Sequence, residues 1–138
     1  MREILFRGKR TDNGTWAYGY LFCIWERTYL CWGTTNDVPN MKEVIPETVG
    51  QFTGLTDRNG KRIFEGDICK FKRFNDVHIG KVVFNVTTAS FIMWYQPIVG
   101  AYGEKATQKM LLSVCDDIEI IGNIHDNPKI LKGGEDNG

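Results

Sequence analysis

The sequence predicts a mainly β protein with little helix, in which an antiparallel N-terminal meander is followed by a small β-barrel. Turn signals recur along the whole chain and separate short runs rich in β-branched and aromatic residues. One of these runs also alternates strictly between aromatic and smaller side chains. With 138 residues, the chain fits one domain or two small subdomains.

The clearest predicted strand covers residues 15–24. Its alternation places one set of side chains on a single face: Trp16, Tyr18, Tyr20, Phe22 and Ile24. The preceding Asp12-Asn13-Gly14 suits a tight hairpin turn, so we expect residues 4–7 to pair antiparallel with this strand. Residues 29–32 are interpreted as the next strand. We interpret the aromatic stripe as core, whereas an exposed stripe would mark a protein interface.

The remaining strands are predicted at residues 63–71, 80–86, 90–95 and 117–121, a spacing that is typical of a small barrel. Residues 34–46, with two prolines, are expected to form a connecting loop, and helical turns are expected only near residues 42–49, 105–112 and 127–131. The predicted organisation is a meander with its linker over residues 1–62, a barrel over 63–131 and a disordered tail over 132–138. Packing of the first two parts as one compact unit remains an alternative.

Charge and cysteine content narrow the possible classes of protein. Seventeen basic residues balance seventeen acidic ones, so the whole chain carries no electrostatic signature for nucleic acid or an anionic membrane. The first residues are too charged for a signal peptide, and no apolar run approaches the roughly 20 residues that span a bilayer. We therefore expect a cytoplasmic protein. Its four cysteines form no Cys-x-x-Cys pair and are interpreted as reduced, small core residues.

Residues 44–68 read VIPETVGQFTGLTDRNGKRIFEGDI, and this block closely resembles the signature of the YopX family of phage and prophage proteins. The opening MREILFRGKR and the IGNIHDNP of residues 121–128 are similar to the two ends of that family. The resemblance implies a mostly β protein of the bacterial host cytoplasm with an SH3-like barrel in its C-terminal half. It implies no activity. Residues 23–37 and 75–108 match no family pattern, and we expect a specific partner to bind there.

The residues of the signature favour architecture over chemistry. Its four glycines suit turns that need positive φ or close backbone approach: Gly50, Gly54, Gly60 and Gly66. Asp57 and Asp67 are short acidic side chains that can accept hydrogen bonds from backbone N–H groups inside such turns. A carboxylate pair that performs acid–base or metal chemistry is the weaker interpretation of the Glu65-Gly66-Asp67 turn.

The sequence contains no pattern typical of catalysis. His78 and His125 stand alone, so we expect no metal site, and no Walker spacing or other motif suggests a cofactor. A Cys115–His125 nucleophile pair lies in no recognised local motif. A small hydrolase built on Asp67, Asp117 and His125 is kept as a minor hypothesis. The main hypothesis is a non-enzymatic accessory protein that acts through protein contacts or self-assembly.

The alternative hypothesis is a nucleic-acid-binding barrel. Residues 69–74 interleave three cations with two aromatic side chains, a combination that can pair with phosphates and stack on bases. The residues assigned to this surface are Lys70, Lys72, Arg73 and Lys81. Alternation, however, places Lys70 and Lys72 on one face and Phe71 on the other, which is also the pattern of an ordinary half-buried strand.

Overall fold

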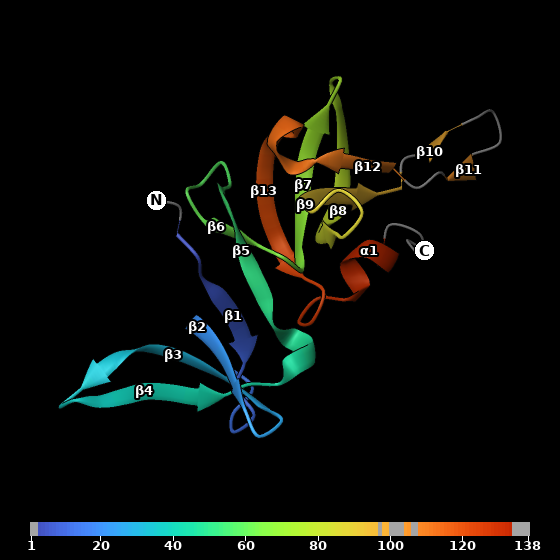
Figure 1. Ribbon diagram of the computed structural model, residues 1–138. Coiled ribbons are helices and arrows are strands. Elements are labelled where there is room, and N and C mark those ends of the chain that lie inside the picture. Colours follow the sequence, from blue (N-terminus) through green and yellow to red (C-terminus); the bar gives the residue numbers. More distant parts are fainter. Residues whose placement is uncertain (1–2, 97, 100–103, 106–107, 134–138) are drawn as a thin grey trace. The chain divides into compact units, whose positions relative to one another are not determined.

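The computed structural model describes residues 3–96, 98–99, 104–105 and 108–133, and nearly all of its regular structure is antiparallel β (Figure 1). The chain divides into two compact units, Met1–Gly54 and Leu55–Gly138. The sequence-based boundary after residue 62 stays a prediction. The predicted tail begins inside the last helix at residue 132, and its residues 134–138 lie outside the described residues.

The N-terminal unit is a sheet with the strand order β4-β3-β2-β1-β5. Its elements are β1 (Phe6–Lys9), β2 (Trp16–Ile24), β3 (Arg27–Thr35), β4 (Val38–Glu43), the 3-10 turn η1 (Pro46–Thr48) and β5 (Gly50–Thr56). Strand β2 pairs antiparallel with β1 on one side and with β3 on the other, which confirms the predicted hairpin and the strand that follows it. Strand β5 continues into the C-terminal unit, where its hydrogen-bonded neighbour is β6 (Arg62–Phe64).

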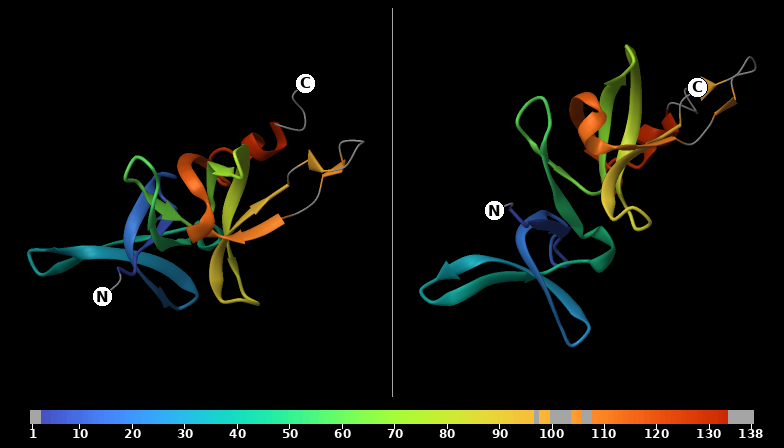
Figure 2. Two further views of the ribbon diagram at one scale, coloured as in Figure 1. Left: turned by 90° about the horizontal axis from the view of Figure 1, so that it is seen from above. Right: turned by 45° about the horizontal axis from the view of Figure 1, so that its top comes forward.

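The predicted loop over residues 34–46 is wrong. Strands β3 and β4 form a hairpin there, which extends away from the rest of the N-terminal unit (Figure 2). Its turn residues Asn36 and Asp37 both have positive φ, the conformation that two-residue hairpin turns require. Pro39 is tolerated because β4 is an edge strand, where a missing N–H breaks no ladder. Pro39 is therefore compatible with an edge strand, and Pro46 begins η1.

The interpretation of the aromatic stripe as core is also wrong. The buried side chains of this unit are Ala17, Leu30 and Val44, packed by the partly buried Phe6, Leu21 and Val49. Gly19 belongs to the same face of β2, and a Cβ there would collide with the backbone carbonyl of Cys31, so this face brings β3 close. Alternation identifies which residues share a face, but the small residues of the opposite set decide which face is covered.

The C-terminal unit contains a five-stranded antiparallel sheet with the order β12-β9-β8-β7-β13. Its strands are β7 (Asp67–Arg73), β8 (Asp76–Asn85), β9 (Ser90–Tyr95), β12 (Gln108–Leu111) and β13 (Asp116–Asn123), with a separate pair β10 (Ile98–Val99) and β11 (Glu104–Lys105). Strands are thus found at every predicted site in this half. Over the described residues the sheet stays open between β12 and β13, so a closed barrel is not present and the SH3-like arrangement remains a prediction.

Helix is as scarce as predicted. Beyond η1, the described elements are a 3-10 turn η2 (Leu112–Val114) and the helix α1 (Lys129–Gly133). The helical turn predicted at residues 105–112 is wrong for residues 108–111, which form β12. No helix in the described ranges has the length and apolar character needed to cross a membrane.

The core of the C-terminal unit lies on one face of its sheet. Phe71 meets Tyr95 edge-on, with ring centroids 5.0 Å apart, and His78 packs 4.9 Å from the same tyrosine ring. The other buried members are Ile63, Cys69, Val82, Met93, Leu112, Cys115 and Ile118. On the opposite face, Ile130 of α1 lies over Gly122, whose cross-strand partner Ile68 is fully buried.

The signature block supports this unit through one carboxylate. Asp57 follows β5 and is only 6% exposed. One of its oxygens accepts backbone N–H bonds from Asn59 and Lys61, each 2.9 Å long, and the other accepts one of 3.1 Å from Ile120. The turn closes at Gly60, whose φ of 81° suits glycine. The structural role that the sequence predicted for Asp57 is therefore confirmed, and it reaches a strand 63 residues away.

Candidate interaction surfaces

One face of the N-terminal sheet is lined by aromatic side chains. Antiparallel partners share a face, and the register pairs Tyr18 with Arg7, Tyr20 with Cys31, and Phe22 with Tyr29. We call this surface the aromatic face and define it by seven residues of β2 and β3: Trp16, Tyr18, Tyr20, Phe22, Ile24, Tyr29 and Cys31. It lies opposite the core formed by Ala17 and Leu30.

The aromatic face is substantially open to solvent. Tyr20 is 66% exposed and Tyr18 is 46% exposed. Phe22 and Tyr29 stack across β2 and β3, with centroids 5.3 Å apart and planes inclined by 18°. At the other end, the guanidinium carbon of Arg7 lies 4.7 Å from the Trp16 ring centroid. These contacts hold the rings of Trp16, Phe22 and Tyr29 in place, so part of the face is an ordered apolar surface.

The structure brings together three of the four cations assigned to nucleic acid. Lys70 and Lys72 alternate onto the face of β7 opposite Phe71, and Lys81 joins that face because it pairs with Ile68. Arg73 belongs to the other set of the alternation, and its guanidinium carbon lies 4.0 Å from the Phe74 ring centroid. The side chain of Lys81 is half-buried, with Nζ 4.7 Å from the Trp94 ring centroid.

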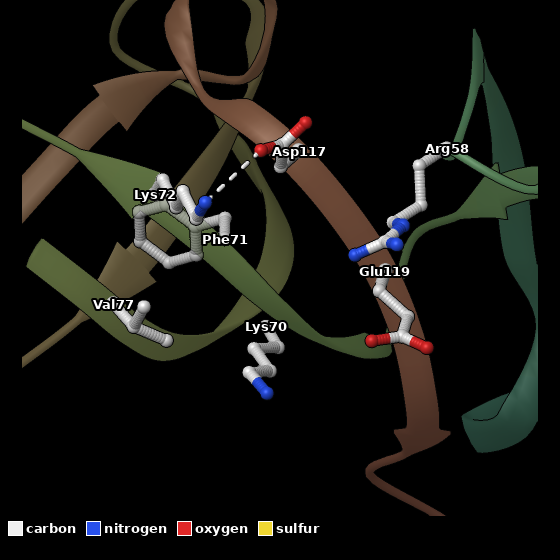
Figure 3. A pocket seen from close by; sticks show the side chains of 7 residues that line it. All are labelled: Arg58, Lys70, Phe71, Lys72, Val77, Asp117 and Glu119. Atoms are coloured by element: carbon white, nitrogen blue, oxygen red, sulfur yellow. Dashed lines mark ion pairs between the residues drawn. The ribbon is translucent and has the colours of Figure 1, made fainter. Parts of the chain in front are cut away.

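A shallow hollow lies beside Lys70 and Lys72 (Figure 3). Its lining comes from the turn after β5 and from strands β7, β8 and β13: Arg58, Lys70, Phe71, Lys72, Val77, Asp117 and Glu119. Lys72 forms an ion pair with Asp117 at 3.4 Å. Asp117 has a φ of 50° and lies where the register of β13 shifts, and such bulges re-aim side chains. The hollow therefore carries both signs of charge.

The structure does not bring Asp67 and Asp117 together, as the minor hydrolase hypothesis would need. Asn123 pairs with Asp67 and Asp116 pairs with Lys72, so Asp67 on β7 and Asp117 on β13 lie at opposite ends of this strand pair, about 16 Å apart by strand length. The Asp67 carboxylate is buried and accepts a 2.8 Å bond from the Phe64 N–H. Burial raises the pKa of the Cys115 thiol to about 11, which makes it a poor nucleophile. Among the described residues, no group of three His, Cys, Asp or Glu side chains could hold a metal ion.

Comparison with known proteins identifies the family of the chain. The model of the family described as YopX protein matches residues 5–132. The chain belongs to the YopX family. It is also similar to the crystal structure of protein EF1440 from Enterococcus faecalis, with 19% identity over 95% of this chain and 99% of that one, at a TM-score of 0.48. A search of curated protein sequences finds no match.

Within this YopX-family chain, sequence reasoning missed two kinds of surface residue. Lys109 and Trp94 are cross-strand partners on the lysine-bearing side of the C-terminal sheet, but they lie 15 residues apart in sequence and only the strand register joins them. The aromatic turn residues Trp25 and Phe74 are 92% and 79% exposed. Phe74 belongs to the segment 69–74 that the sequence singles out, whereas Trp25 carries no such signal, because large aromatic side chains are not among the residues that mark turns.

Proposed function

We propose that this YopX-family chain is a non-enzymatic accessory protein of a phage or prophage, which acts in the bacterial cytoplasm through protein contacts. The contact surface is the aromatic face, and its partner is a second copy of the chain. The C-terminal sheet is proposed to be SH3-like, as the family resemblance implies, and to play no part in this contact.

The exposure of Tyr18 and Tyr20 is the observation that carries this proposal. Ordered aromatic side chains are enriched in protein interfaces because they bury a large area with little loss of conformational freedom. Here they occupy the face of β2 that the core does not use, since Ala17 and Leu30 already fill the other face. The Phe22–Tyr29 stack holds two further rings of this face in place, which reduces the entropy lost when the surface is covered.

A second copy is the partner that the charge and the size of the surface favour. Equal numbers of acidic and basic residues remove the long-range repulsion that would keep two copies apart. Strand β2 has nine residues and spans about 30 Å, and the two strands β2 and β3 cover about 10 Å, which gives a flat area of about 300 Å². Standard interfaces bury about 800 Å² per partner, so the expected dimer is weak and depends on concentration.

Sedimentation equilibrium of a double variant, Tyr18→Ser with Tyr20→Ser, tests the role of the aromatic face. Both side chains are exposed and outside the core, so the variant is expected to unfold at the same temperature as the wild type. We expect it to remain monomeric at concentrations where the wild type is dimeric. Val86→Ser is the matched control, because Val86 is an exposed apolar residue of the C-terminal unit. Equal association of wild type and double variant would contradict the proposal.

A further inference from the structure

The outer face of the C-terminal sheet, opposite its core, collects lysines that the sequence scatters. One cross-strand row runs from Lys109 through Trp94 to Lys81, so a single aromatic ring lies between two cations. Lys70 and Lys72 belong to the same face on β7, with Ile79 and Val77 as their partners on β8. We call this surface the lysine face and define it by Lys70, Lys72, Ile79, Lys81, Trp94 and Lys109.

The charge on this face is positive despite the neutrality of the whole chain. With Arg58 at the rim included, the described residues of this face provide five cations. The acids beside them are Asp116, Asp117 and Glu119. All three acids belong to β13, at one edge of the sheet, and Lys72 is the cation paired with one of them. The row of Lys109 and Lys81 continues through Ile68 to Gly122, which lies at the end of β13 away from the three acids. This end of the face therefore holds uncompensated positive charge.

The turn between β7 and β8 supplies a second aromatic ring. Its residues Phe74 and Asn75 have φ values of 52° and 69°, and the same backbone occurs at Trp25–Glu26 and Asn36–Asp37. Such turns favour Asn, Asp and Gly, as at Asn36, because other side chains are strained at positive φ. Phenylalanine has no preference for positive φ. Burial does not explain Phe74 either, since its ring is 79% exposed. This exposed ring, with the Arg73 guanidinium carbon 4.0 Å from its centroid, combines strain with a cation at the end of the sheet, which points to a role in recognition.

We infer that the lysine face binds single-stranded nucleic acid, with its lysines on the phosphates and the rings of Phe74 and Trp94 against the bases. Single strands offer both the phosphates and the open base faces that such a surface needs, whereas a duplex hides its base faces. From the Trp94 row to the β7–β8 turn the face measures about 20 Å along β7, which suits a site of roughly four or more nucleotides. This site lies in the C-terminal unit and does not rest on the proposed self-association.

Fluorescence anisotropy with labelled oligonucleotides of about 20 nucleotides tests this inference. The probes are oligo(dT), oligo(rU) and a mixed-sequence DNA duplex, each titrated at several salt concentrations. We expect at least one single-stranded probe to bind more tightly than the duplex, with an affinity that falls as salt rises. Absence of binding by both single-stranded probes at low salt would overturn the inference, and so would equal or tighter binding of the duplex.

Two variants separate recognition from folding. Lys81→Ala with Lys109→Ala should reduce the magnitude of the negative slope of log affinity against log salt by about 1.4. Lys42→Ala, in the N-terminal unit, should leave this slope unchanged. Phe74→Asn should weaken binding by about 5- to 50-fold while raising or preserving the unfolding temperature, because Asn suits the turn. Trp25→Asn is its control and should bind as the wild type does. Wild-type affinity in the Phe74 variant, or an unchanged slope in the lysine variant, would overturn the assignment.

Discussion

Asp57 is the residue whose environment explains the turn between β5 and β6 in physical terms. Its carboxylate is buried, which alone would raise its pKa, but backbone N–H donors from Ile120, Lys61 and Asn59 bring the pKa below its ordinary value. The charged form is thus the form that the fold stabilises. A single side chain thereby fixes the β5–β6 turn and holds β13 to it.

Replacing the Asp57 carboxylate should destabilise the folded protein. Asp57→Asn keeps the shape but turns one acceptor into a donor that faces backbone N–H groups, so we expect a loss of about 1.5–3 kcal/mol in the free energy of unfolding at pH 7. Urea denaturation measures it. Asp37→Asn, at an exposed turn, is the control and should change stability by less than about 0.5 kcal/mol. A loss no larger than that of the control would show that the three bonds do not stabilise the fold.

The pKa of Asp57 also predicts a pH dependence. Because the folded pKa is lowered, the carboxylate stabilises the protein above its unfolded pKa of about 3.9, and this contribution is lost as pH falls through the folded pKa. The difference in stability between wild type and Asp57→Asn should therefore be largest near neutral pH and shrink below about pH 4. Urea denaturation over a pH series measures it, and a difference that is constant with pH would contradict the lowered pKa.

The cysteines provide a further residue-scale prediction. Cys23 is exposed, whereas Cys115 is buried and burial raises its thiol pKa to about 11. At pH 8 about one Cys115 thiol in a thousand is ionised, so Cys23 should react with an aromatic disulfide reagent at once and Cys115 only as the protein unfolds. Mass spectrometry of labelled peptides distinguishes the two sites. Equal labelling rates in the folded protein would contradict the buried position of Cys115.

Among the elements, the hairpin turns are places where removal of a large aromatic side chain is expected to stabilise the protein. Trp25 is 92% exposed and has a φ of 48°. Trp25→Asn should therefore raise the stability of the protein, by about 0.5–1 kcal/mol, since Asn populates this region of φ more readily. Thermal unfolding measures the change. A clear destabilisation would mean that the ring packs in a way that its exposure does not reveal.

The same elements show which parts of the fold the sequence predicts. Period-two alternation predicted β2, and Asp12-Asn13-Gly14 predicted its hairpin with β1, because both signals are local. Strand β4 was missed because two prolines outweighed the Asn36–Asp37 turn, although prolines are compatible with an edge strand. The covered face of β2 was assigned wrongly because burial depends on Leu30 and Val44, which come from other elements.

The candidate surfaces were predictable to a smaller degree than the fold. Lys70 and Lys72 were assigned to one face from alternation alone, and the register bears this out. Lys109 and Trp94 reach the same face only through pairing of β9, β8 and β12, which local patterns do not specify. The exposure of the aromatic face likewise follows from which side of the sheet the core occupies.

In the whole molecule, we propose that the two units have different binding roles. Each has its own core, centred on Leu30 and Val44 in one and on Phe71 and Val82 in the other. The aromatic face belongs entirely to the first unit and the lysine face to the second. We therefore expect that substitutions in one face leave the activity of the other intact, as measured by sedimentation and by anisotropy on the same variants. Loss of both activities in the Tyr18→Ser, Tyr20→Ser variant would contradict this division.

Light scattering over a concentration series tests whether the aromatic face joins two copies of the chain. For a monomer of 15.8 kDa, we expect a molar mass that rises towards twice this value as the protein concentration increases from about 1 to 500 µM. A molar mass that stays at 15.8 kDa throughout this range would contradict it.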